Sequence, residues 1–302
     1  MAKQQPRILT GQVAAITGGA RGIGRAIAEG FLREGMRVAI GDVDVATAEQ
    51  TARELGRDTV ALPLDVTRRE SIASFADEAE KRLGPIDVFV SNAGIMHVGR
   101  FLDEDDATAI RQIDINVHGV MCGAKVMLPR FVERGRGHLV NIASQAGKAG
   151  VPGLATYCAS KHAVVGLSES LRGELRNMGA DGISISVVMP NLVGTELGVG
   201  VESSRFSPVL TPEQVAEEVV AALKEERFEV YVPRSAKGVL YVSGLLPRRG
   251  REAVARAAKV DRMMWEANMD ARKGYELRAA HSEPGLEPGT AQDQLPERAG
   301  SS

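Results

Sequence analysis

Short apolar runs alternate with amphipathic stretches along most of the chain. The first run, "QVAAIT", is apolar nearly throughout, and in the following "GIGRAIAEGFLREG" Ile23, Ile27 and Phe31 recur on one helical face. We interpret the later runs "RVAIGD", "TVALPLD", "IDVFVSNAG", "HLVNIAS", "ISISVVMP" and "FEVYVP" as strands in the same way. Strands that are apolar on both faces and alternate with helices predict a parallel sheet covered by helices on both sides.

This alternation predicts a doubly wound, Rossmann-type α/β domain over residues 8–234, with about seven strands. Two long helices are expected over about 105–131 and 153–178. Residues 235–280 hold a short apolar run, "GVLYVSGLL", and an arginine-rich helical pattern, which predict a basic amphipathic helical extension. Residues 281–302 are rich in Pro, Gly, Glu and Ser, and we expect them to be disordered because they bury too little apolar surface.

Composition is typical of a soluble globular protein, with 44% hydrophobic and 25% charged residues. The net charge of −2 provides no overall attraction to nucleic acid, and no nucleic-acid partner is expected. The two cysteines, Cys122 and Cys158, exclude a disulfide framework and are typical of free thiols in a reducing compartment. With no apolar core of signal-peptide length at the N-terminus, a cytoplasmic protein is predicted. No metal-ligand spacing is present, so no metal is expected.

The helical extension has two interpretations. Residues 238–262 are suited to peripheral contact with a membrane surface, with the apolar part buried and the arginines among the headgroups. The alternative is a helix that packs on the body of the protein or on another subunit. We favour packing, because the hydrophobicity of the segment is modest and acidic residues are interspersed.

The first strand leads into "TGGARGIG", where Gly18, Gly22 and Gly24 have the spacing of a dinucleotide-binding turn. Glycine allows a tight strand-to-helix turn and lets a pyrophosphate approach the backbone, while the helix N-terminus attracts the phosphates. A glycine cluster alone is weak evidence, but this one lies between the first strand and the first helix, as the motif requires.

The second strand ends at Asp42, about twenty residues beyond the glycines. A carboxylate there accepts hydrogen bonds from ribose hydroxyls and repels a 2′-phosphate, so we predict NAD(H) rather than NADP(H). Arg21 favours the opposite choice, because a cation in the turn can bind that phosphate. We give Asp42 more weight, since it opposes the phosphate directly; its alternative role is that of a helix cap.

Tyr157 and Lys161 lie in "YCASK", about 40° apart on one helix face. A phenol with a pKa of about 10 is a poor base, and a nearby ammonium stabilises the phenolate. Ser144 ends the preceding strand, at the edge of a parallel sheet where ligands bind, and can hydrogen-bond a substrate oxygen. The pattern predicts a proton relay to or from a hydroxyl group. Cys158 lies about 100° around the helix from Tyr157 and is interpreted as packing.

These motifs together resemble the short-chain dehydrogenase/reductase family over about residues 8–234. The resemblance is specific, because six motifs occur in order at coherent strand and helix ends. Two departures, Ser91 before "NAG" and Asn191 in place of a glycine, remove no catalytic group. The matching positions are "TGGARGIG", Asp65 in "LDV", "SNAG", Asn116 in "INVHG", Ser144, "YCASK", and Pro190 with Thr195.

The resemblance implies a role for each site residue. Tyr157 is the general acid/base, Lys161 lowers the pKa of Tyr157 and holds the nicotinamide ribose, and Ser144 orients the substrate oxygen. Asn116 supports a water that links Lys161 to solvent. A homodimer or homotetramer that pairs through the two long helices is also implied. The cofactor-binding residues, besides Tyr157 and Lys161, would be Gly18, Arg21, Gly22, Ile23, Gly24, Asp42, Asp65, Val66, Asn92, Ala93, Gly94, Pro190, Val193 and Thr195.

Mostly apolar residues flank the expected cleft, which predicts a steroid-, retinoid- or lipid-like substrate. The chain is therefore predicted to interconvert a hydrophobic alcohol, such as a secondary alcohol, and its ketone or aldehyde with NAD(H). Alternatives are a non-catalytic nucleotide-sensing or scaffold protein, an NADP(H)-dependent carbonyl reductase, and an isomerase or dehydratase on the same fold. The candidate substrate residues are Met96, His97, Gln145, Val151, Leu192 and Leu197.

Overall fold

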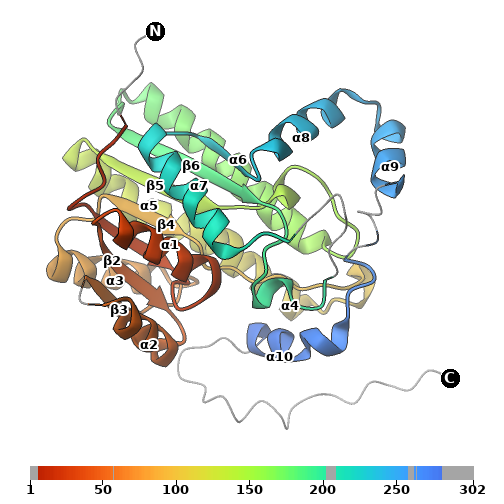
Figure 1. The fold of residues 1–302 in the computed structure, drawn as a ribbon, viewed down its shortest axis with the longest axis horizontal. Coiled ribbons are helices and arrows are strands. Elements are labelled where there is room, and N and C mark those ends of the chain that lie inside the picture. Colours follow the sequence, from red (N-terminus) through yellow and green to blue (C-terminus); the bar gives the residue numbers. More distant parts are fainter. Residues whose placement is uncertain (1–5, 57, 202–208, 258–261, 263, 281–302) are drawn as a thin grey trace.

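Seven parallel strands form one sheet in the order β3-β2-β1-β4-β5-β6-β7 (Figure 1). The computed structural model describes residues 6–56, 58–201, 209–257, 262 and 264–280, and the strands belong to these ranges. The predicted doubly wound α/β sheet is confirmed. The strands are β1 (Val13–Thr17), β2 (Arg37–Asp42), β3 (Thr59–Pro63), β4 (Val88–Ser91), β5 (Gly137–Ile142), β6 (Ile183–Pro190) and β7 (Glu229–Val232).

Helices cover both faces of the sheet, with α1, α2 and α7 on one face and α3, α5 and α6 on the other. In β1, Ala14 and Ile16 pack in the first core, whereas Val13 and Ala15 pack in the second. This period of two explains why the strand is apolar throughout. The helices are α1 (Gly22–Arg33), α2 (Val45–Leu55), α3 (Arg69–Leu83), α4 (Asp106–Ile113), α5 (Gly119–Arg134), α6 (Ala155–Asn177), α7 (Pro212–Glu225), α8 (Ser235–Leu245), α9 (Arg248–Ala257) and α10 (Met269–Ala280).

The long helix expected over 105–131 is interrupted in the structure. Between α4 and α5 lies a π turn, Asp114–His118, which contains Asn116. π turns of this kind are found often at functional sites, because they push a side chain out of the regular helical register. The second long helix, expected over 153–178, is α6.

The extension after the sheet is helical, as predicted. It consists of α8, α9 and α10, and Figure 1 shows α8 and α9 projecting away from the sheet while α10 lies below α4. The tail 281–302, for which disorder was predicted, lies outside the described residues.

The carboxyl ends of the strands meet at one edge of the sheet. β1 pairs with β2 on one side and with β4 on the other, so the chain order reverses at β1. Ligands of such sheets bind in the crevice that forms at this point. The loops after β1, β4, β5 and β6 are therefore the elements that position a site.

Candidate active site

The glycine turn after β1 packs against the loop after β4. Gly18 and Gly22 have φ angles of 65° and 55°, in the left-handed region that favours glycine. A Cβ atom on Gly18 would lie 2.8 Å from the Cα of Ala93, and one on Gly24 would lie 2.2 Å from the carbonyl oxygen of Gly18. Side chains at these positions would break both contacts, so the turn depends on glycine.

Asn92 braces this turn from β4. Its side-chain nitrogen donates to the carbonyl oxygens of Thr17 at 3.0 Å and Gly18 at 2.9 Å. The backbone N–H groups of Asn92 and Ala93 both donate to the hydroxyl of Thr17, each at 3.0 Å. Asn92 and Ala93 were expected to line a cofactor groove, and the structure shows in addition that they hold the turn in place.

The N-terminus of α1 fits a dinucleotide pyrophosphate. No side chain of the described residues caps it, since Arg21 stands at the cap position without a capping hydrogen bond. The N–H groups of the first helical turn are therefore left for an anionic ligand.

Asp42, at the end of β2, binds two backbone N–H groups. Its carboxylate accepts from Ala20 at 3.2 Å and from Asp44 at 3.1 Å. Burial raises the pKa of Asp42, and these two N–H groups oppose the increase. The residue that caps α2 is Asp44, whose side chain accepts from the backbone N–H of Thr47 at 3.1 Å. Asp42 is therefore not the helix cap.

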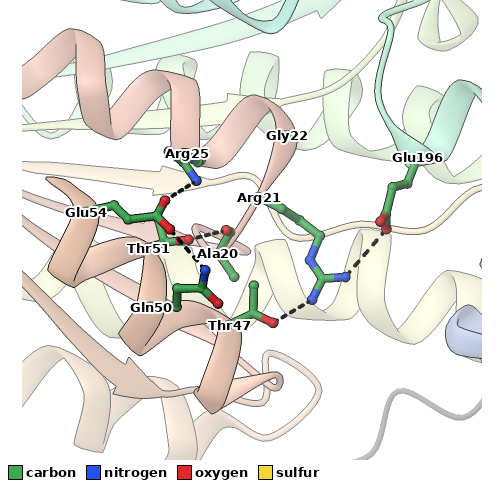
Figure 2. Close-up of a pocket in the computed structure, with 9 residues that line it drawn as sticks. All are labelled: Ala20, Arg21, Gly22, Arg25, Thr47, Gln50, Thr51, Glu54 and Glu196. Carbon is green, nitrogen blue, oxygen red and sulfur yellow. Dashed lines mark hydrogen bonds and ion pairs between the residues drawn. The ribbon is translucent and has the colours of Figure 1, made fainter. Parts of the chain in front are cut away.

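The guanidinium of Arg21 is compensated by two carboxylates. It pairs with Asp44 and, at 3.5 Å, with Glu196, and it donates to the Thr47 hydroxyl at 3.2 Å. Figure 2 shows Arg21 between Thr47 and Glu196, at a pocket between α1 and α2. Its charge is thus already engaged within the chain.

Ser144, Tyr157 and Lys161 come together at the start of α6. Ser144 is hydrogen-bonded to Tyr157. The ammonium of Lys161 donates to the carbonyl oxygen of Ile142 at 3.0 Å and lies 5.6 Å from the centroid of the Tyr157 ring. Tyr157 and Lys161 are only 7% and 5% exposed, so the pair is nearly shielded from water.

Burial moves the pKa values of this pair in opposite directions, because it penalises the charged form of each. It raises the pKa of Tyr157 to about 12, against the hydrogen bond with Ser144, which lowers it. It lowers the pKa of Lys161 to about 8. Burial therefore dominates the pKa of Tyr157, and the phenol holds its proton. The role of Lys161 in lowering this pKa stays a prediction.

The carboxamide of Asn116 is fully buried and connects the π turn to two other segments. It accepts from the N–H of Ile95 at 2.9 Å and donates to the carbonyl of Ile95 at 2.9 Å. It also donates to the hydroxyl of Ser160 at 3.1 Å. A Cβ atom on Gly94 would lie 3.0 Å from its oxygen and 3.6 Å from the Lys161 nitrogen, so all three groups are close neighbours. The water-supporting role of Asn116 stays a prediction.

The loop after β6 lies against the glycine turn. Pro190 ends β6, and its carbonyl oxygen accepts from the Ser144 hydroxyl at 3.4 Å. Val193 is buried and forms an isolated parallel bridge with Leu210. A Cβ atom on Gly22 would lie 3.3 Å from the methyl carbon of Thr195. The structure therefore brings these residues to the predicted cofactor side of the crevice.

Asp65, Val66 and Ile23 have clear local roles. The carboxylate of Asp65 accepts from the N–H and the hydroxyl of Thr67, at 2.9 and 2.6 Å. Val66 is buried against Gly119, and Ile23 packs on the core of α1 and α7. Contact between these residues and a cofactor stays a prediction.

Four of the six candidate substrate residues meet next to Tyr157 in an apolar cluster, which we call the substrate cluster. His97 and Gln145 have other contacts: Gln145 donates to the carbonyl of Val232 at 3.0 Å, and the Nδ1 of His97 lies 2.9 Å from Glu276. The cluster consists of Met96, Val98, Ala146, Leu154, Tyr157, Cys158, Leu192 and Met264, with Val151, Leu197, Val201 and Ala267 packed against it.

The sequence analysis missed the contribution of α10 and the segment before it. Met264 belongs to the substrate cluster, and Arg272 is fully buried. The ion pair of Arg272 with Glu276, four residues apart at 2.9 Å, is the signal that the sequence offered. It went unrecognised because the whole stretch was interpreted only as membrane-binding or packing.

The chain is similar to known short-chain dehydrogenases. A family model described as "short chain dehydrogenase" matches residues 12–205. Epidermal retinol dehydrogenase 2 of Homo sapiens is 33% identical over 245 residues, covering 79% of each chain. 17-beta-hydroxysteroid dehydrogenase 13 of Rattus norvegicus is 31% identical over 260 residues, covering 85% of this chain and 86% of the relative.

A solved structure has the same architecture. It is a short chain dehydrogenase/reductase from Burkholderia phymatum in complex with NAD, with a TM-score of 0.71 and 27% identity. The match covers 79% of this chain and 94% of that one.

The buried Lys161 predicts a distinct pH dependence of stability. Its pKa falls from 10.5 to about 8, so between these values the unfolded chain binds more protons and the free energy of unfolding rises with pH. Lys161→Met lacks this contribution. We expect the stability of the variant relative to wild type to fall by roughly 2–3 kcal/mol between pH 8 and 10.5. Denaturant titrations across this range measure it, with the exposed Lys81→Met as control. A constant difference would contradict the burial of a lysine with a lowered pKa.

Proposed function

Since the chain belongs to the short-chain dehydrogenase/reductase family and is an oxidoreductase acting on CH–OH groups, we propose that it interconverts a hydrophobic alcohol and its carbonyl compound with NAD(H): a secondary alcohol and its ketone, or a primary alcohol and its aldehyde. The observation that supports this most is the substrate cluster, which surrounds the buried Tyr157 with apolar side chains. Relatives named as retinol and 17-beta-hydroxysteroid dehydrogenases support the same substrate class.

The proton relay follows from the contacts of the site. The nicotinamide cofactor, when bound, supplies or accepts the hydride. In the reducing direction Tyr157, which its raised pKa keeps protonated, donates its proton to the substrate oxygen. Ser144 stabilises the same oxygen by a hydrogen bond. The ammonium of Lys161 offsets the charge of the phenolate that remains, and in the oxidising direction this phenolate takes the proton back.

The residues of the nucleotide half fit NAD(H). The glycine turn and the uncapped N-terminus of α1 would hold the pyrophosphate, and Asp42 would bind the adenosine ribose. Asp42 opposes a 2′-phosphate, and Arg21 has its charge offset by Asp44 and Glu196. These ion pairs support NAD(H), with the NADP(H)-dependent reductase as the alternative.

The exchange Tyr157→Phe removes the acid/base and tests the proposed function. We expect turnover to fall by roughly 10²–10⁴-fold, while NAD⁺ affinity changes little. Absorbance of NADH, recorded with a panel of apolar secondary alcohols, all-trans-retinol and estradiol, measures turnover. Tyr231→Phe removes another buried phenol, whose hydroxyl bonds to Glu229 and takes no part in the proposed relay, and serves as control. A wild-type protein that binds NAD⁺ but oxidises none of the panel would refute the proposed function and favour a sensor or an isomerase.

Cofactor choice is tested by Asp42→Asn, which removes the negative charge. The N–H groups of Ala20 and Asp44 bind different carboxylate oxygens, so the asparagine oxygen keeps an acceptor for only one of them. We expect kcat/KM with NADP⁺ relative to NAD⁺ to rise about tenfold, the equivalent of roughly 1.4 kcal/mol. The exposed Asp103→Asn is the control. An unchanged ratio would show that Asp42 does not determine the choice of cofactor.

We propose in addition that α8 and α9 contact a membrane surface peripherally. The side chains of Val239, Tyr241, Val242 and Leu245 on α8 are 61–74% exposed, whereas Leu240 packs against the sheet. The next helix, α9, contains four arginines and one glutamate, which suits anionic headgroups. No helix among the described residues has both the length and the apolar character to span a bilayer. Homo-oligomerisation and a cytoplasmic location stay predictions.

The membrane proposal predicts that Leu245→Asp weakens vesicle binding. Flotation with phosphatidylcholine vesicles that contain phosphatidylglycerol should lose about tenfold of the bound wild-type fraction, because an apolar anchor is replaced by a charge. Met178→Asp, at a similarly exposed methionine on the end of α6, should bind as wild type does. Equal binding of both variants, or no binding of wild type, would favour the packing alternative.

A further inference from the structure

The segment 264–280, which contains α10, lies across two loops that carry the substrate cluster. One loop follows β4 and contains Met96; the other follows β6 and contains Leu197. Backbone approaches are close at two places. After β6, the carbonyl of Gly200 accepts from the N–H of Asn268 at 2.7 Å, and in the segment before α6 a Cβ atom on Gly153 would lie 3.3 Å from the carbonyl carbon of Met264. The segment is thus packed into this part of the fold.

Arg272 fastens the segment to both loops. Its guanidinium donates to the carbonyl of Met96 at 2.8 Å and to the carbonyls of Leu197 and Val199 at 2.8 and 2.9 Å. Glu276 accepts its remaining Nε proton at 2.9 Å and offsets the charge. Burying an arginine costs much free energy unless its N–H groups are hydrogen-bonded. The hydrogen bonds of Arg272 therefore hold the segment in its position against the two loops.

The hydroxyl group of Tyr275 has an unused hydrogen-bond donor. Its hydroxyl oxygen accepts the backbone N–H of Met96 at 2.8 Å, but no acceptor for its own proton is found among the described residues. Burial raises the pKa of Tyr275, so Tyr275 stays protonated. A partly buried O–H that lies against the backbone of Met96, a member of the substrate cluster, and has no acceptor among the described residues suits a polar atom of a ligand.

His97, in the loop after β4, and Glu276, on α10, make a further contact between the segment and the rest of the fold. The Nδ1 of His97 lies 2.9 Å from the carboxylate of Glu276, and this hydrogen bond raises the pKa of His97. At the rim, Arg278 pairs with Glu196 at 3.1 Å. Glu196 also pairs with Arg21 of the glycine turn, so the segment touches the nucleotide half as well.

We propose that residues 264–280 form a wall of the substrate site, in which Arg272 is a positioning residue and Tyr275 determines specificity by donating its hydroxyl proton to a substrate oxygen. The proposal rests on the proposed function for the identity of the substrate as an apolar alcohol or ketone. It adds the residues that form one side of the site and the hydroxyl group that binds the polar end of the substrate.

Tyr275→Phe tests the specificity role, with Tyr241→Phe on exposed α8 as matched control. The kcat/KM for all-trans-retinol should fall about tenfold in Tyr275→Phe, because retinol has a single oxygen and the lost hydrogen bond is to that reacting oxygen. Affinity for NAD⁺ should not change. Equal kcat/KM values for the two variants would overturn the role of Tyr275.

Arg272→Met tests the fastening, with the exposed Lys273→Met on the same helix as matched control. Hydrogen exchange of residues 264–280 should accelerate at least tenfold in Arg272→Met and stay as in wild type in Lys273→Met. The KM for retinol should rise in parallel, and Arg272→Lys, which supplies fewer planar donors, should fall between. Wild-type exchange and KM in Arg272→Met would overturn the proposal.

A measurement without turnover separates this inference from the proposed function. Trp265 is the only tryptophan of the chain and lies in the segment, so quenching of its emission by all-trans-retinol reports binding at the wall. Quenching that weakens in Tyr275→Phe but not in Tyr241→Phe supports the wall even if no alcohol is oxidised. Turnover with equal retinol binding by both variants would leave the proposed function intact and refute the wall.

Discussion

The buried carboxamide of Asn116 ties three separate segments to one point. Through Ile95 it holds the loop after β4, through its own π turn it links α4 to α5, and through Ser160 it reaches α6. Ser160 lies between Tyr157 and Lys161, and its hydroxyl also donates to the carbonyl of Tyr157 at 2.7 Å. An amide with all these bonds satisfied is costly to displace from a dry site, so the position of the catalytic pair follows from it.

The site obtains its chemistry from burial rather than from an unusual set of charges. The pKa values of the Tyr157 phenol and the Lys161 ammonium differ by half a unit in ordinary peptides. The same dry surroundings move them apart, to about 12 for the phenol and about 8 for the ammonium. At neutral pH this places a proton on both. The fold therefore places the neutral phenol of Tyr157 close to the ammonium of Lys161. When the phenol loses its proton, this positive charge stabilises the phenolate.

The parts of the site that follow local rules could be predicted from the sequence. The glycine turn, Asp42 at a strand end and the spacing of Tyr157 and Lys161 are each read within a few residues. The π turn at Asn116 could not be predicted in this way, because its partner Ile95 lies 21 residues earlier. The same holds for the bracing of the glycine turn by Asn92, 74 residues after Gly18.

The closing segment shows the limit most clearly. Arg272 meets Met96 across 176 residues, and it contacts the backbone, so no side-chain pattern at either position announces the pair. What the sequence carried was an i,i+4 ion pair on a polar helix, which is a common surface feature. Only its complete burial distinguishes it, and burial is a property of the tertiary structure.

The way in which Arg272 binds has a consequence for how this enzyme can diversify. Its guanidinium donates hydrogen bonds to backbone carbonyl oxygens, which every amino acid has. The side chains of Met96, Leu197 and Val199 therefore take no part in the hydrogen bonds of Arg272, and an exchange at any of these positions leaves its acceptors in place. The lining of the proposed wall and its attachment thus depend on different atoms of the same residues.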